Sequence, residues 1–266
     1  MTLAFHKYEG LGNDFVVIDV GHDGVISPER ARELCDRHFG IGADGVLMVT
    51  PPSSEGARAR MVVLNADGSR PEMCGNGIRC VALHLAIRDG ADGISYVVDT
   101  DRGPLLCEVE RQGEAGSVRV GMGRGRVEEP YEADVDGRRV RFLRVSMGNP
   151  HAINFEEPMT AEHADRVGPL VSGAFAEGSN VELAQRTGDD AFEVVVWERG
   201  VGRTLACGTG AAATAVAAAR AGLARFDAPI QVRLPGGPLE LLVASETLEV
   251  TMRGPARRVF SGNVGD

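Results

Sequence analysis

Two short stretches decide the fold: Met73-Cys74-Gly75-Asn76-Gly77 and Ala206-Cys207-Gly208-Thr209-Gly210 each place Cys-Gly-x-Gly where a loop turns into a helix. The first N–H groups of a helix have no acceptor within it, and the helix dipole is positive at that end. Such a position can hold a carboxylate, and it lowers the pKa of a nearby thiol. Two such sites in one chain predict a pair of thiols that face one substrate from opposite sides.

The two halves of the chain repeat outward from these stretches. Gly12-Asn13 matches Gly148-Asn149 at an offset of 136 residues, and Cys74 matches Cys207 at an offset of 133. A third pair precedes each cysteine by nine residues: Asn65 and Glu198. Three matches in one order and at nearly one offset predict two homologous units.

Short strand-like runs bounded by Gly, Pro, Asp or Asn dominate the chain. They are residues 15–19, 46–50, 60–65, 96–99, 105–110, 118–121, 140–145, 152–155, 192–197, 230–234, 239–243, 248–252 and 258–260. Helices are predicted at residues 27–37, 77–88, 161–170 and 210–221. The last is apolar all round, which suits a helix enclosed by a curved sheet. We expect an α/β (α+β) fold of two pseudo-symmetric domains, 1–115 and 116–254, each a curved, mostly antiparallel sheet around a central helix.

Composition narrows the class of protein. The 266 residues are 43% hydrophobic and 25% charged, and the net charge of -10 argues against non-specific binding to nucleic acid or to an anionic membrane. Residues 1–10 lack the apolar core of a secretory signal, and the uncharged run 204–219 is too short to span a bilayer. We therefore expect a cytoplasmic protein with reduced thiols and with neither nucleic acid nor membrane as a partner.

The remaining cysteines and the histidines carry no separate chemistry in this interpretation. Cys35 and Cys107 fall in an expected helix and strand, where a small buried side chain is the expected role. Cys80 follows Cys74 by six residues, which is the wrong spacing for a metal or redox pair. The six histidines show no metal-ligand spacing, so no metal site is predicted.

Paired thiols suit the racemisation of an amino acid. A weakly acidic Cα proton must leave one face and return on the other, so two groups must flank the carbon and exchange roles with direction. Thiols suit this role if the helix N-termini bring their pKa near neutrality, and the same N–H groups would stabilise negative charge growing on the substrate carboxylate. The only lysine, Lys7, lies in no recognisable pyridoxal-binding motif.

Further motifs stand in order around the cysteine loops: Gly10-Leu-Gly-Asn-Asp-Phe15, Asn65-Ala-Asp-Gly68, Ser146-Met-Gly-Asn-Pro-His151, Ser179-Asn-Val181 and Trp197-Glu-Arg-Gly200. With them, nearly the whole chain resembles the diaminopimelate epimerase family. The resemblance implies an isomerase that interconverts LL- and meso-diaminopimelate without pyridoxal phosphate or another cofactor, for lysine and peptidoglycan precursor biosynthesis. It also implies a homodimer, and a tail 255–266 that returns to the first domain.

The resemblance also implies residue roles. Cys74 and Cys207 would be the acid/base pair. The backbone of Gly75, Asn76, Gly208 and Thr209 would hold the reacting carboxylate. The rest of the substrate would be bound by Asn13, Asn65, Asn149, Asn180, Glu198 and Arg199. The residues themselves agree, because a distal amino acid centre needs a cation for its carboxylate, such as Arg199, and oxygens for its ammonium group. One departure is Gly45, where some members carry Gln.

Other functions remain open at this level. A proline or hydroxyproline racemase would keep the two thiols, but it would need no distal Arg or Glu and typically has His where this chain has Asn76. A thiol hydrolase or a redox protein would use one of the cysteines, but a hydrolase needs a His positioned by a third group, and the sequence offers no convincing pair. A non-enzymatic binding module is the last alternative. The asparagines are also compatible with a purely structural role in turns.

Overall fold

The computed structural model describes residues 2–21, 25–71 and 73–265. Their contacts divide the chain into unit 1, Met1–Val120 with Gly254–Asp266, and unit 2, Gly121–Arg253. The expected boundary after residue 115 falls inside strand β7 (Ala115–Arg124), whose residues as far as Val120 belong to unit 1. The last strand, β16 (Glu249–Gly265), begins in unit 2 and continues into unit 1.

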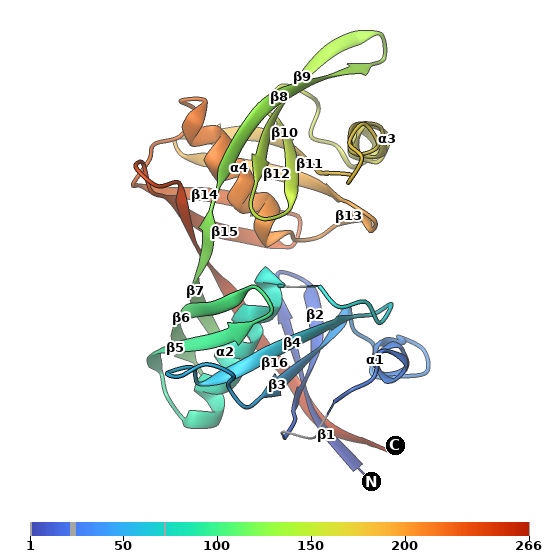
Figure 1. Ribbon diagram of the computed structural model, residues 1–266, viewed down its shortest axis with the longest axis vertical. Coiled ribbons are helices and arrows are strands. Elements are labelled where there is room, and N and C mark those ends of the chain that lie inside the picture. Colours follow the sequence, from blue (N-terminus) through green and yellow to red (C-terminus); the bar gives the residue numbers. More distant parts are fainter. Residues whose placement is uncertain (1, 22–24, 72, 266) are drawn as a thin grey trace. The chain divides into compact units, whose positions relative to one another are not determined.

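Unit 1 is built from antiparallel strand pairs joined by helical crossovers (Figure 1). Its strands are β1 (Thr2–Gly10), β2 (Asn13–Asp19), β3 (Gly45–Thr50), β4 (Ala59–Asn65), β5 (Gly93–Thr100) and β6 (Gly103–Gln112). Helix α1 (Pro28–Cys35) links the parallel pair β2 and β3, and helix α2 (Gly75–Asp89) links the parallel pair β4 and β5. The pairs β1/β2, β3/β4 and β5/β6 are antiparallel.

Unit 2 repeats this pattern. Its strands are β8 (Arg126–Val135), β9 (Arg138–Ser146), β10 (Pro150–Asn154), β11 (Asn180–Gly188), β12 (Ala191–Glu198), β13 (Gly202–Thr204), β14 (Pro229–Leu234) and β15 (Gly237–Val243). Helix α3 (Ala161–Ser172) links the parallel pair β10 and β11, and α4 (Gly208–Arg220) links the parallel pair β12 and β14. The predicted pseudo-symmetric α/β fold is confirmed by this second set of crossovers.

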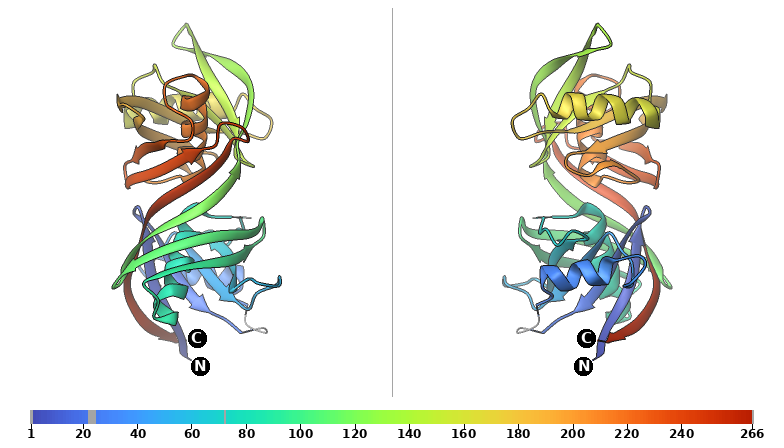
Figure 2. Two further views of the ribbon diagram at one scale, coloured as in Figure 1. Left: turned by 90° about the vertical axis from the view of Figure 1, so that its left-hand side faces the viewer. Right: turned by 90° about the vertical axis from the view of Figure 1, so that its right-hand side faces the viewer.

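Strands β2–β4 of unit 1 are buried on both faces, to which their alternate side chains point. In β3, Leu47 and Val49 join the core around α2, whereas Val46 and Met48 join the core around α1. Figure 1 shows the two helices on opposite sides of β2–β4. Figure 2 (right) shows α1 and α3 each lying across the strands of its own unit. Burial on both faces explains the nearly continuous apolar runs of these strands.

Helices α2 and α4 are enclosed, as their sequences predict. All of α4 is buried except Thr209 and Arg220, and it contacts strands of its own unit around its circumference. Both helices begin two residues earlier than expected, at Gly75 and Gly208, because the cysteine before each glycine is the N-cap. Among the described residues, no helix has both the length and the apolar character needed to cross a bilayer.

Four strands were not expected from the sequence: β1, β8, β11 and β13. Strand β8 is rich in charged residues and contains Pro130, and it is an edge strand of the sheet. Charged residues and proline are typical of edge strands, where they discourage pairing with another chain, but they hide the alternation that identifies a strand.

Candidate functional site

Cys74 and Cys207 hold equivalent positions at the N-termini of α2 and α4. Each is an N-cap residue with an extended backbone. The N–H of Gly77 donates to Sγ of Cys74 at 3.3 Å, and the N–H of Gly210 donates to Sγ of Cys207 at 3.4 Å. The sulfur therefore takes the place of the oxygen that normally caps a helix, and each thiol lies at the positive end of its helix dipole.

The glycine three residues after each cysteine leaves room for the sulfur. A Cβ at Gly77 would lie 3.3 Å from Cβ and 3.4 Å from Sγ of Cys74. A Cβ at Gly210 would lie 3.3 Å from both atoms of Cys207, and 2.7 Å from Oε1 of Glu182. The second glycine of each Cys-Gly-x-Gly stretch thus allows the close approach of the backbone to the thiol.

The residue two after each cysteine is tied to an asparagine of its own unit. Nδ2 of Asn76 donates to Oδ1 of Asn13 at 3.2 Å in unit 1. Nδ2 of Asn149 donates to Oγ1 of Thr209 at 3.3 Å in unit 2. The Gly-Asn turns that repeat in the sequence therefore meet the cysteine loops in both units, and the structure brings these predicted site residues together within each unit.

A polar network that the sequence reasoning missed supports the site in unit 1. The guanidinium of Arg79, fully buried in α2, donates to Oδ1 of Asn76 at 2.8 Å and to the carbonyls of Gly75 and Pro255. Oδ2 of Asp44 accepts from Nδ2 of Asn13 at 2.7 Å. The sequence signal was an arginine next to the apolar run from Cys80 to Leu83, since a buried charge needs partners.

Cys207 lies in a buried, acidic environment. Burial raises the pKa of this thiol well above its usual value, and the carboxylates of Glu198 and Glu182 raise it further. The hydrogen bonds from Thr209 and from the N–H of Gly210 lower it by less. At Cys207, burial and the two carboxylates therefore outweigh the effect of the helix N-terminus on the pKa of the thiol.

Next to the Cys207 loop lies a buried pair of polar residues that the sequence did not predict. His151 and Glu182 are fully buried, and Nδ1 of His151 lies 2.7 Å from Oε1 of Glu182. Nε2 of His151 lies 3.2 Å from Oδ1 of Asn149, so the chain of contacts runs from Glu182 through His151 and Asn149 to Thr209. Among the described residues, Oε2 of Glu182 has no hydrogen-bond partner. The signal in the sequence was a glutamate between two apolar residues of a strand, Val181 and Leu183.

The residues predicted to bind the distal part of a substrate fall into two groups. In unit 2, Oδ1 of Asn180 accepts from the backbone N–H of Arg199 at 3.0 Å. The exposed Arg199 side chain donates to the carbonyl of Glu177 at 2.6 Å. Oγ1 of Thr204 donates to Oε1 of Glu198. Burial raises the pKa of this carboxyl group, and the neighbouring Thr204 hydroxyl and Cys207 thiol lower it by less.

The side chain of Asn65 is hydrogen-bonded within its own turn. It is exposed at the end of β4, and its Nδ2 donates to Oγ of Ser69 at 2.9 Å. The departure at Gly45 also has a structural reason. A Cβ there would lie 2.7 Å from the carbonyl oxygen of Leu64 on the paired strand β4, so this backbone has no room for a side chain.

The other three cysteines are buried in unit 1. Burial raises the pKa of Cys35 to about 11 and that of Cys107 to about 12, and it also raises the pKa of Cys80. Thiols that stay protonated in an apolar core are unreactive. The structure thus distinguishes these three from the two N-cap thiols, which adjoin polar groups.

The chain is similar to known proteins over nearly its whole length. The family profile described as "Diaminopimelate epimerase" matches residues 5–127 and 143–259. The chain is 41% identical over 281 residues to the diaminopimelate epimerase of Synechocystis sp., covering 98% of this chain and 99% of the relative. It is 43% identical over 290 residues to that of Synechococcus sp. strain JA-3-3Ab, covering 99% of both.

Solved structures extend the likeness of fold. A "probable proline racemase" from Agrobacterium radiobacter K84 has a TM-score of 0.78 at 16% identity, covering 99% of this chain and 93% of that one. A hydroxyproline epimerase from Agrobacterium vitis has a TM-score of 0.77, also at 16% identity, covering 99% of this chain and 91% of that one. At this identity the likeness shows a shared fold.

Proposed function

The chain belongs to the diaminopimelate epimerase family, and we propose that it interconverts LL- and meso-2,6-diaminopimelate by proton transfer through Cys74 and Cys207, without a cofactor. The observation that carries this proposal is the repeated N-cap thiol, one in each unit and each at a helix N-terminus. This reaction supplies precursors of lysine and peptidoglycan.

The proposed mechanism uses one thiolate and one thiol. The thiolate removes the Cα proton from one face of the amino acid centre, and the electron pair of the C–H bond passes into the adjacent carboxylate. The thiol on the other side then gives its proton to the opposite face of Cα. The proton count is unchanged over the turnover, and the two sulfurs have exchanged protonation states. The reverse reaction uses the same groups in exchanged roles.

The helix N-termini stabilise the carbanion in this mechanism. The backbone N–H groups of Gly75, Asn76, Gly208 and Thr209 belong to first helical turns, so they have no acceptor within their helices. We assign to them the reacting carboxylate, on which negative charge grows as the proton leaves. Removing one such donor from an oxyanion site typically costs about 10²- to 10³-fold in kcat.

Cys207 enters the proposed reaction as the acid. Its pKa is raised by burial and by Glu198 and Glu182, which favours the protonated thiol before substrate binds. Cys74 then supplies the thiolate for the stereoisomer that presents its Cα proton to this side. The contact of the Cys207 thiol with Glu198 supports a role for this glutamate in holding the proton.

The distal amino acid centre of diaminopimelate is assigned to polar side chains of both units. Arg199 pairs with the distal carboxylate through two parallel hydrogen bonds. The remaining groups of the distal centre bind to amides and oxygens of Asn13, Asn65, Asn149, Asn180 and Glu198.

We expect Arg199→Ala to lower kcat/KM by more than about 100-fold, because hydrogen bonds to charged groups contribute about 1.5–3 kcal/mol each. Arg203→Ala is the matched control, since Arg203 is also exposed but pairs with Asp165. Equal kcat/KM in both variants would exclude recognition by Arg199.

The decisive experiment is incubation of the reduced protein with LL-diaminopimelate in deuterated water, without added metal or cofactor. Meso product with one deuterium at the inverted Cα is the expected result. Cys74→Ala and Cys207→Ala should each abolish epimerisation while diaminopimelate still binds. Absence of product and of exchange in the unmodified protein would exclude diaminopimelate as substrate, and parallel incubations with proline and other amino acids would then test the racemase alternative.

We also propose that the protein is a cytoplasmic homodimer. Its only other proposed binding partner is the small-molecule substrate, diaminopimelate. Five free cysteines support a reducing compartment, and family membership supports the dimer. Light scattering coupled to size exclusion measures the assembly directly, and a monomer at micromolar concentration would contradict it. Fractionation of the cells that make the protein tests its location.

A further inference from the structure

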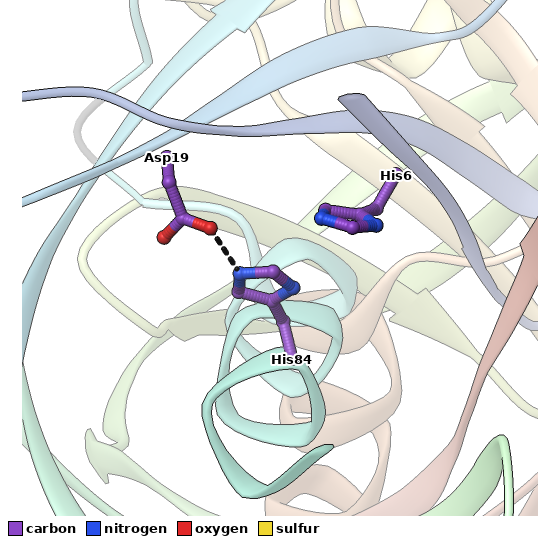
Figure 3. A group of neighbouring side chains, drawn as sticks. All are labelled: His6, Asp19 and His84. Carbon is purple, nitrogen blue, oxygen red and sulfur yellow. Dashed lines mark hydrogen bonds and ion pairs between the residues drawn. The ribbon is translucent and has the colours of Figure 1, made fainter. Parts of the chain in front are cut away.

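Three side chains of unit 1 form a cluster that the sequence spacing conceals. His6 comes from β1, Asp19 ends β2, and His84 projects from α2 (Figure 3). One potential ligand atom from each lies within 4.8 Å of the other two. The residues are 13 and 65 positions apart along the chain, which is why no metal-binding motif is visible in the sequence.

The ligand atoms point toward one another. Nε2 of His84 lies 2.9 Å from Oδ2 of Asp19. Two ligand atoms at about 2.0–2.1 Å from a tetrahedral zinc ion lie about 3.3 Å apart. The observed distance is only a few tenths of an ångström shorter, so the two side chains would move apart by that amount if an ion replaced the proton of the hydrogen bond. The imidazole of His6 lies beside that of His84, with ring centroids 5.0 Å apart, and Figure 3 shows it turned toward the pair.

Neighbouring hydroxyl groups can accept hydrogen bonds from the tautomers that a metal site needs. Nδ1 of His84 lies 3.2 Å from the hydroxyl of Tyr8, and Nδ1 of His6 lies 2.7 Å from Oγ of Ser261. With a proton on each Nδ1, both rings donate to these oxygens and keep Nε2 for an ion. Such outer contacts orient most histidine ligands in metal sites.

The surrounding charges leave one carboxylate oxygen for an ion. Arg88 donates to Oδ1 of Asp19 at 2.7 Å, so Oδ2 is the oxygen that faces His84. Arg258, the other cation near His6, is paired with Glu114. Asp19 is exposed and His6 is partly exposed, which gives an ion and a fourth, water ligand access from solvent.

We propose that His6, Asp19 and His84 bind one divalent transition-metal ion of the zinc class through two imidazole nitrogens and one carboxylate oxygen. The ion joins α2 to β1 and β2 and stabilises unit 1. His84 lies ten residues beyond Cys74, about 15 Å along the helix, so the ion takes no part in proton transfer at the thiol. The proposal is independent of the proposed function.

The test is titration of the reduced, metal-free, full-length protein with Co²⁺ and with Zn²⁺. One equivalent of Co²⁺ should give visible d–d absorption without the intense ultraviolet band of cobalt–thiolate bonds, and Zn²⁺ should displace it. His6→Gln and Asp19→Asn should weaken binding by more than the loss typical of outer contacts, which is about 10- to 100-fold. Tyr8→Phe should weaken it within that range.

His38→Gln is the matched control, because His38 is exposed and outside the cluster. The His38→Gln variant should bind the metal as the unmodified protein does. Zn²⁺ should raise the melting temperature of both of these proteins, but it should not raise that of His6→Gln. A thiolate band, or equal binding by His6→Gln and the unmodified protein, would overturn the proposal. His6→Gln keeps the buried His84 in place, and its melting temperature without metal verifies that it folds.

Discussion

At the scale of single residues, the two N-cap thiols share a backbone position but not an environment. A Cβ added at Gly77, in the Cys74 loop, would lie 3.0 Å from a methyl group of Leu47. A Cβ added at Gly210, in the Cys207 loop, would lie 2.7 Å from the carboxylate of Glu182. Burial, followed by the carboxylates of Glu198 and Glu182, raises the pKa of Cys207. The repeated scaffold therefore places its two thiols in different local environments.

Gly210→Ala tests how closely the backbone must approach the Cys207 thiol. Its Cβ would lie 2.7 Å from Oε1 of Glu182 and 3.3 Å from Sγ, so one of these groups has to move. We expect kcat to fall by at least about 10-fold, with a loss of about 1–3 kcal/mol in unfolding free energy. Gly121→Ala, where a Cβ meets nothing within 4 Å, is the control for both measurements. Full activity of Gly210→Ala would contradict this account.

Asp99 gives a prediction for stability at low pH. Burial alone would raise the pKa of this carboxyl group, but hydrogen bonds from Ser54 and Ser53 outweigh it and lower the pKa to about 2. The unfolded value is about 3.9, so the stabilisation is present above pH 4 and is lost as the pH falls toward 2. The shift corresponds to about 2 kcal/mol.

Asp99→Asn should therefore remove about 2 kcal/mol at pH 7 and flatten the pH dependence of unfolding between about pH 4 and 2. Denaturant titration at several pH values measures both. The control is Asp189→Asn, because the Asp189 side chain is 99% exposed. If Asp99→Asn and the control lose stability in parallel as the pH falls, the hydrogen bonds to Asp99 contribute nothing measurable.

At the scale of elements, the sequence predicts those whose pattern follows from burial. Strand β3 reads as a strand because both of its faces are buried, and α4 reads as an enclosed helix because its residues are apolar all round. Strand β11 was missed because its buried positions include Glu182 and Asn180, whose polarity serves the site. Repeated motifs predicted the two thiols, Asn13, Asn65 and Asn149, and the family resemblance added Asn180. The contacts of Arg79 with Pro255 and of Glu182 with His151 join residues distant in sequence, so no local pattern predicts them.

Helix α3 offers a test of element packing. A Cβ at Gly168 would lie 2.3 Å from Cγ of Trp197 on β12, so the glycine sets how closely helix and strand approach. Gly168→Ala should destabilise the protein by about 1–3 kcal/mol. Trp197 is the only tryptophan, so its emission spectrum should shift in the folded state. The control is Leu170→Ala on the same helix. Because Leu170 is 47% exposed, this substitution should leave the emission spectrum unchanged. An unaltered spectrum in Gly168→Ala would contradict this packing.

At the scale of the whole molecule, the C-terminal part of β16 completes unit 1 with residues from the far end of the chain. Thr2–Lys7 pair with the residues from Phe260 to Gly265, and Ala256 is buried in the core around α2. Each unit has its own enclosed helix and its own apolar core. Domains with separate cores can fold as separate units.

Ala256→Asp should therefore unfold unit 1 at a lower denaturant concentration while unit 2 is less affected, because burying an unpaired charge is among the most destabilising substitutions. Amide exchange of α2 reports on unit 1, and Trp197 fluorescence reports on unit 2. Val259→Asp on the same strand is the control, since Val259 is 49% exposed. Two distinct midpoints in Ala256→Asp are the expected result. If the exchange and fluorescence midpoints fall together, the two units unfold as one cooperative body, and the tail from Gly254 stabilises the whole chain rather than unit 1 alone.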